Sequence, residues 1–158
     1  MDSRVVILPV ENIGQANKRW CWLAVAEQVV RWKQGTSPSQ EVLAASVMGE
    51  DRSGWERGGT LREIGEIIRV HSGEFAVAVG RGEAEEVFDW LNKGVPLVVN
   101  VQTGPEQYHV VVLRGMVWSG APGDPLCIVN DPYVSTGYSL AMPWPQLRKA
   151  WVDALAIV

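Results

Sequence analysis

A cysteine at the start of an apolar segment is the first feature that suggests chemistry. Cys21 stands between two tryptophans, and small apolar residues follow it at helical spacing. The N-terminus of a helix carries partial positive charge and free N–H groups, which favour a thiolate over a thiol. Most free cysteines, however, simply pack in the core. Cys21 therefore predicts chemistry only if a suitable partner occurs elsewhere in the chain.

His109 and a polar pair after the next apolar run are candidate partners. His109 opens the strand-like run HVVVL, and Asn130 and Asp131 end the run CIVND. Imidazole titrates near neutral pH, so a histidine can act as a general base. Either Asn130 or Asp131 could accept the imidazole N–H and fix its tautomer, although Asn-Asp-Pro is also a common turn sequence. Successive strand residues face opposite sides, so only one of the two is expected to reach His109.

Gln15 supplies a fourth candidate group, six residues before Cys21. A side-chain amide at that place could donate a hydrogen bond to the oxyanion that forms when a thiolate attacks a carbonyl. In isolation, a glutamine in a loop is a solvated residue. The four residues together indicate acyl-transfer chemistry at an amide or ester carbonyl.

In this order the motifs resemble the papain-like cysteine peptidases, and their small bacterial branches in particular. QANKRWCWLAV resembles the Gln-x5-Cys-Trp segment of AvrRpt2-type effector peptidases, and YHVVVL with IVNDP resembles both these and the C39-like peptidases. The resemblance runs from about residue 14 to the C-terminus by motif order. The Cys-Gly-Ser-Cys-Trp signature of the plant and lysosomal enzymes is absent, because Arg19 and Trp20 precede the cysteine.

The resemblance implies a role for each residue. Cys21 would be the nucleophile and His109 the general base and acid. Gln15 and the backbone N–H of Cys21 would form the oxyanion hole. Asp131 would orient the imidazole; the papain–cathepsin branch uses an asparagine, which would point to Asn130, but the following proline favours Asp131.

The function implied is hydrolysis of a peptide bond in a protein or peptide substrate, as a bacterial effector or toxin or as a precursor-processing protease. The same residue set serves deamidases, transglutaminases and deubiquitinases, which form the first alternative. A non-catalytic binding module on the same fold is the second alternative. An inhibitor or immunity protein is a further partner that the effector hypothesis would allow.

The elements that must position these residues follow an α+β order. Periodicity and capping signals predict helices at residues 19–33, 39–48 and 60–72. Strands are predicted at 5–10, 74–80, 95–102, 108–119, 125–132, 137–142 and 152–158, with helices at 82–94 and 143–151. The papain-like expectation is one domain over residues 1–158. A helical lobe at about 14–72 would carry the catalytic helix, packed on an antiparallel β lobe at about 73–158.

The composition and charge of the chain argue against several classes of binding partner. The net charge is −4 with both signs spread along the chain, which argues against nucleic acid. No apolar run approaches the roughly 20 residues of a membrane helix. The N-terminus lacks the features of a secretory signal, so we expect a cytoplasmic protein or one exported without a signal peptide. Two cysteines and two histidines at wide spacings do not predict a metal site, and no cofactor is expected.

Overall fold

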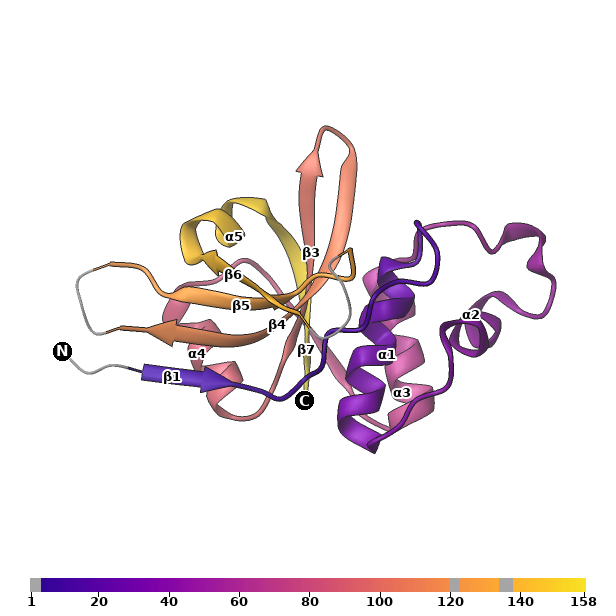
Figure 1. Cartoon of the computed structure of the whole chain (residues 1–158), viewed down its shortest axis with the longest axis horizontal. Coiled ribbons are helices and arrows are strands. Elements are labelled where there is room, and N and C mark those ends of the chain that lie inside the picture. Colours follow the sequence, from indigo (N-terminus) through magenta and orange to yellow (C-terminus); the bar gives the residue numbers. More distant parts are fainter. Residues whose placement is uncertain (1–3, 120–122, 134–137) are drawn as a thin grey trace.

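The computed structural model describes residues 4–119, 123–133 and 138–158. Helices come first and an antiparallel sheet follows, so the predicted α+β class is confirmed (Figure 1). The helices are α1 (Cys21–Gln34), α2 (Gln40–Met48), α3 (Leu61–Ser72), α4 (Ala84–Asn92) and α5 (Trp144–Ala150), with a 3-10 turn η1 (Arg52–Gly54). The strands are β1 (Arg4–Ile7), β2 (Ala76–Val79), β3 (Leu97–Gly104), β4 (Gln107–Trp118), β5 (Leu126–Asn130), β6 (Leu140–Pro143) and β7 (Trp151–Ile157).

The capping residues in the sequence explain where two of these helices begin. The hydroxyl of Ser39 accepts a hydrogen bond from the backbone N–H of Val42, at the start of α2. Thr60 and Glu63 form a capping box at the start of α3, in which each side chain satisfies the other residue's backbone N–H. Both signals were predicted from the sequence, and both helices begin within a residue of the predicted position.

The strands of the described residues form one seven-stranded antiparallel sheet in the order β2-β7-β3-β4-β5-β6, with β1 paired to β4. The strand that carries His109, β4, pairs antiparallel with β5, the strand that ends just before Asp131. Strand β6 begins at Leu140, and Gly137 of the predicted strand 137–142 lies outside the described residues. Strand β7, the last in the sequence, lies between β2 and β3.

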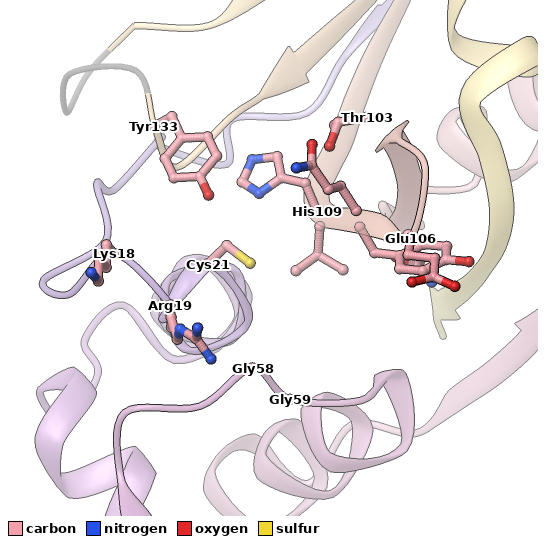
Figure 2. A pocket seen from close by; sticks show the side chains of 13 residues that line it. Lys18, Arg19, Cys21, Gly58, Gly59, Thr103, Glu106, His109 and Tyr133 are labelled. Atoms are coloured by element: carbon pink, nitrogen blue, oxygen red, sulfur yellow. The ribbon is translucent and has the colours of Figure 1, made fainter.

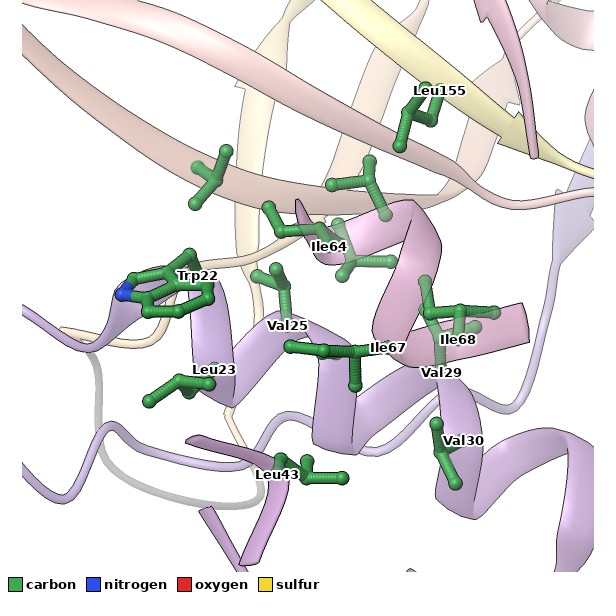
Figure 3. Packing of buried hydrophobic residues seen from close by; sticks show 14 of the residues in the cluster. Trp22, Leu23, Val25, Val29, Val30, Leu43, Ile64, Ile67, Ile68 and Leu155 are labelled. Atoms are coloured by element: carbon green, nitrogen blue, oxygen red, sulfur yellow. The ribbon is translucent and has the colours of Figure 1, made fainter. Parts of the chain in front are cut away.

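Helices cover both faces of the sheet, and the described residues accordingly form two buried clusters. On one face, α1 and α3 pack against the sheet through residues such as Val25, Ile67 and Leu155, as Figure 3 shows. On the other face, α4 and α5 pack over Val99 and Val111. Strand residues 97–99 are therefore all buried, which explains why this stretch is a continuous apolar run and does not alternate.

A buried polar network joins the helical lobe to the sheet. Asn130 at the end of β5 donates from Nδ2 to Oε1 of Gln28 on α1 at 3.1 Å. Gln28 in turn donates to Oδ1 of Asn12 at 3.0 Å, in the segment between β1 and α1. On the sheet side, Nε of Arg114 donates to Oδ1 of Asn130 at 3.0 Å. These bonds fix the position of α1 relative to β4 and β5, the elements on which the candidate residues stand.

None of the helices within the described residues has the length and apolar character needed to cross a bilayer.

Candidate active site

Cys21 is the first residue of α1 and is partly exposed. The preceding residue, Trp20, is the N-cap and gives no side-chain hydrogen bond to the helix. The backbone N–H groups of the first turn therefore remain available to an anion beside the thiol. This arrangement is what the position of the cysteine in the sequence predicted.

The two tryptophans that flank Cys21 attach the loop before α3 to the start of α1. Nε1 of Trp20 donates to the carbonyl of Trp55 at 2.9 Å, and Nε1 of Trp22 donates to the carbonyl of Arg57 at 3.1 Å. Both flanking side chains are buried, so their main role is packing. The polar, glycine-rich loop at residues 49–59 is consequently held against the cysteine.

Gly58 and Gly59 of this loop form part of the wall beside Cys21. A Cβ atom on Gly59 would lie only 2.1 Å from the ring of Trp22, whereas one on Gly58 would meet no atom within 4 Å. The close approach of the loop to α1 therefore requires a glycine at position 59. At position 58 there is room for a side chain.

His109 lies on β4, and the sheet register brings it to Asp131. Val112 on β4 pairs with Asn130, the last residue of β5, so the chain leaves β5 beside the part of β4 that carries the histidine. Nε2 of His109 lies 2.6 Å from Oδ1 of Asp131. The imidazole is 5% exposed, and the same Oδ1 accepts the backbone N–H of Tyr133 at 2.9 Å. The carboxylate is thus held in place from two sides.

The electrostatics of this pair favour a charged imidazole. Burial lowers the pKa of His109, but the hydrogen bond to Asp131 and the proximity and negative charge of Cys21 and Asp131 outweigh burial and raise it from 6.5 to about 9. Burial likewise raises the pKa of Asp131, and the hydrogen bonds and positive charge around it bring the pKa below its ordinary value. The other ring nitrogen of His109, Nδ1, is buried without a hydrogen-bond partner among the described residues.

Tyr133 stacks on the imidazole, with ring centroids 4.2 Å apart and planes inclined by 5°. Its side chain is 65% exposed, so one face covers His109 while the rest is open to solvent. Tyr133 was not among the residues predicted for the site. Its position two residues after Asp131, within the turn that follows β5, was the available signal.

Asn130 and Asp131, the two candidates for the residue that orients His109, have different surroundings. Asn130 is fully buried, and its side chain contacts Gln28 on one side and Arg114 on the other. Asp131 instead contacts His109. Adjacent residues thus face different partners, as expected for neighbours at the end of a strand.

Gln15 lies near the loop after β5 but is not part of the cleft lining. Its backbone N–H donates to the carbonyl of Pro132 at 3.2 Å. Its side-chain Nε2 donates to the carbonyl of Asn17 at 2.9 Å, and Oε1 is buried without a partner among the described residues. The structure therefore brings Cys21, His109 and Asp131 together and places the amide of Gln15 in a loop that contacts the residues next to Asp131.

A cleft of about 730 Å³ runs past the cysteine, between the helical lobe and the hairpin of β3 and β4 (Figure 2). Cys21 and His109 lie together in its wall, and the close-up shows the sulfur pointing into the cleft with the imidazole above it. The second cysteine, Cys127, is buried elsewhere, and burial raises the pKa of its thiol to about 12. Of the two thiols, Cys21 is the one placed for reaction.

Comparisons with known proteins identify the fold and the family of the chain. The chain matches no curated protein. A C39-like peptidase from Bacillus anthracis has a TM-score of 0.70 at 18% identity, with 98% of each chain covered. The peptidase domain of Streptococcus ComA, a bi-functional ABC transporter involved in quorum sensing, has a TM-score of 0.65 at 19% identity, covering 94% of this chain and 98% of that one.

UfSP from C. elegans has a TM-score of 0.62 at 10% identity, covering 98% of this chain and 34% of that one. At these identities the structures show that the fold is shared, which confirms the predicted papain-like architecture. The sequence pattern of the Peptidase_C39 like family matches residues 7–154, nearly the whole chain. The chain therefore belongs to the Peptidase_C39 like family.

Proposed function

We propose that the protein is an endopeptidase that cleaves protein or peptide substrates with Cys21 as nucleophile, His109 as general base and acid, and Asp131 as the residue that orients the imidazole. Membership in the Peptidase_C39 like family indicates cysteine peptidase activity. The observation that carries the residue assignment is the 2.6 Å contact between Nε2 of His109 and Asp131, which leaves Nδ1 for exchange of a proton with the thiol.

The first chemical step follows from this arrangement. With a pKa of about 9, His109 holds a proton at neutral pH and supports a thiolate on Cys21 as an ion pair. The thiolate attacks the scissile carbonyl carbon, and the electron pair of the C=O bond moves to the oxygen. The tetrahedral intermediate then collapses as His109 gives its proton to the leaving amine, and a thioester to Cys21 remains.

Water completes the reaction. His109 removes a proton from a water molecule, which attacks the thioester and regenerates the thiolate. Asp131 holds the imidazole in one tautomer and orientation through both steps.

The oxyanion would be stabilised by the backbone N–H of Cys21 and by Gln15. A primary amide nitrogen has two N–H donors, and the carbonyl of Asn17 uses one of those on Gln15. We assign the second to the oxyanion on the basis of the resemblance and of the position of Gln15 beside the residues next to Asp131, since Gln15 itself does not line the cleft. A donor of this kind is worth roughly 3 kcal/mol in the transition state.

The test compares wild-type protein with Cys21→Ala and Cys127→Ala on a mixed peptide library, with products identified by mass spectrometry. We expect Cys21→Ala to remove cleavage without loss of folding, because the nucleophile is gone. Cys127→Ala is the matched control and should retain cleavage, because its thiol is buried and protonated. Cleavage by Cys21→Ala would disprove the assignment.

Two other results would favour one of the alternative functions. Release of ammonia from glutamine-containing substrates without peptide cleavage would identify a deamidase or transglutaminase. Cys21 that reacts with iodoacetamide no faster than a free cysteine at neutral pH, in a protein that cleaves nothing, would favour a binding module. An effector role and the identity of the natural substrate stay predictions of the resemblance.

A further inference from the structure

The cleft carries opposite charges at its two ends. Lys18 and Arg19, in the loop before α1, and Glu106, at the tip of the hairpin of β3 and β4, are its charged lining residues besides His109. Figure 2 shows Lys18 on one side of Cys21 and Glu106 on the other. All three charged side chains are exposed, and none has a hydrogen bond or ion pair with another described residue.

Arg57, a further cation close to the cleft, already has an anionic partner, unlike Lys18 and Arg19. Arg57 stands in the loop that reaches Gly58, but its guanidinium pairs with Glu63 at 2.7 Å. Hydrogen bonding to that carboxylate, its largest influence, raises the pKa of Arg57. Lys18 and Arg19 on one wall of the cleft and Glu106 on the other thus differ from Arg57, because their charged groups have no partner among the described residues.

The backbone conformation of Glu106, at the tip of the hairpin, is also unusual. Its φ is 55°, and no other non-glycine residue in the described part of the chain has a positive φ. The left-handed conformation is unfavourable for a residue with a Cβ, and glycine or asparagine is the usual choice at such a turn position. A glutamate at this position gives the cleft a carboxylate that the turn itself does not need. Residues held in rare conformations occur often at ligand sites.

We infer that the cleft selects peptides that carry an acidic side chain on the Lys18 and Arg19 side of the scissile bond and a basic side chain on the Glu106 side. This inference rests on the proposed peptidase function and specifies its substrate class. Charges of opposite sign attract across the few ångströms of a cleft, and like charges repel. A peptide with both charges reversed would place each side chain against a residue of its own sign.

Binding to the Cys21→Ala variant tests the inference without requiring turnover. Four octapeptides of the same length and backbone would be compared by fluorescence anisotropy: glutamate before and lysine after the central bond, the reverse order, glutamine at both positions, and glutamate at both. We expect one of the two mixed orders to bind about fivefold more tightly than the glutamine peptide at low salt, and the other mixed order to bind more weakly than it. The advantage should shrink on addition of about 0.5 M NaCl.

Charge-removing variants then assign the preference to residues. In the Cys21→Ala background, the double change Lys18→Gln and Arg19→Gln should remove the advantage of glutamate, and Glu106→Gln should remove that of lysine. Lys93→Gln and Glu50→Gln are the matched controls, because both residues are exposed and lie outside the cleft. Glu106→Gly should also remove the lysine preference while raising the midpoint of thermal unfolding, since glycine adopts this φ without strain.

The outcomes separate this inference from the proposed function. Equal binding of the four peptides, absence of binding, or a preference that survives in the Lys18, Arg19 and Glu106 variants would overturn the inference. In the active protein, Cys21-dependent cleavage of library peptides without charge preference would overturn the inference and leave the peptidase assignment in place. Charge-selective binding without Cys21-dependent cleavage would support the inference and count against the peptidase.

Discussion

At the scale of single residues, His109 is held from three directions. Asp131 accepts a hydrogen bond from one ring nitrogen, Tyr133 covers a face of the ring, and Cys21 lies near the remaining nitrogen. Because two of these neighbours carry or acquire negative charge, they favour the imidazolium over the neutral ring. His109 can therefore stay protonated at neutral pH, where the proposed reaction needs it as a general acid for the leaving amine.

This arrangement predicts the titration of His109. Its pKa of about 9 in the folded protein lies above the ordinary 6.5, so between these values the folded state holds a proton that the unfolded chain has released. The resulting stabilisation is complete below pH 6.5 and is lost as the pH rises through about 9. Asp131→Asn should lower the titration midpoint, because the carboxylate charge is gone.

NMR titration of the imidazole C–H resonances would measure both midpoints, with His109→Gln as the control that assigns the signal. Equal midpoints near 6.5 in wild type and Asp131→Asn would contradict the prediction.

Residue types and order were sufficient to predict a candidate set of Cys21, His109 and either Asn130 or Asp131. They were not sufficient to choose between Asn130 and Asp131, because that choice depends on which way each side chain leaves β5. The stacking of Tyr133 and the position of Glu106 depend on turn conformations, which the sequence pattern does not specify.

At the scale of elements, the loop at residues 49–59 forms a wall of the candidate site, a role that its sequence does not indicate. Its polar, glycine-rich sequence fits an ordinary surface loop as well as the wall of a groove. Hydrogen bonds from Trp20 and Trp22 to its carbonyl groups hold it against α1. Helix ends, by contrast, were predictable, because local signals such as the Thr60–Glu63 capping box determine them.

The two glycines of the loop provide a matched test. Gly59→Ala should lower the free energy of unfolding by about 1–3 kcal/mol and reduce kcat/KM, because the new methyl group would displace the ring of Trp22 and with it the cleft wall. Gly58→Ala should have little effect on stability, because nothing lies within 4 Å of its added Cβ. Chemical denaturation and peptide hydrolysis would be measured on both. Equal losses in the two variants would show that the loop does not pack on α1 as described.

At the scale of the whole molecule, two apolar layers and one polar network hold the lobes together. Apolar periodicity predicted the helices and strands that bury the two clusters. It could not predict the sheet order, since β7 pairs with β2 and β3 across long stretches of chain. Nor could it predict the network of Asn12, Gln28 and Asn130, whose members are far apart in the sequence.

The network predicts that Asn130 serves stability, whereas its neighbour Asp131 serves peptide hydrolysis. Asn130→Ala should lower the free energy of unfolding by about 3 kcal/mol, because buried partners such as Gln28 and Arg114 would lose hydrogen bonds. Asp131→Asn should instead reduce peptide hydrolysis, and its loss of stability should shrink as the pH rises through about 9, where His109 releases its proton. Urea denaturation would measure the stabilities, with Asn92→Ala on an exposed helix end as control. A small loss in Asn130→Ala would show that the network does not contribute to the junction.

The place of β7 has a consequence for the order in which the protein matures during synthesis. The segments that carry Cys21, His109 and Asp131 all leave the ribosome before this strand, yet β7 lies between β2 and β3 in the sheet. A nascent chain that has not reached residue 151 therefore has β2 separated from the rest of the sheet. Such a chain also leaves the sheet-facing side of α3 incompletely covered, because Leu155 belongs to that core. Translation of the last strand thus sets the earliest time at which the cleft becomes rigid, and premature termination shortly before it would release a protein that has every candidate catalytic residue but an incomplete sheet.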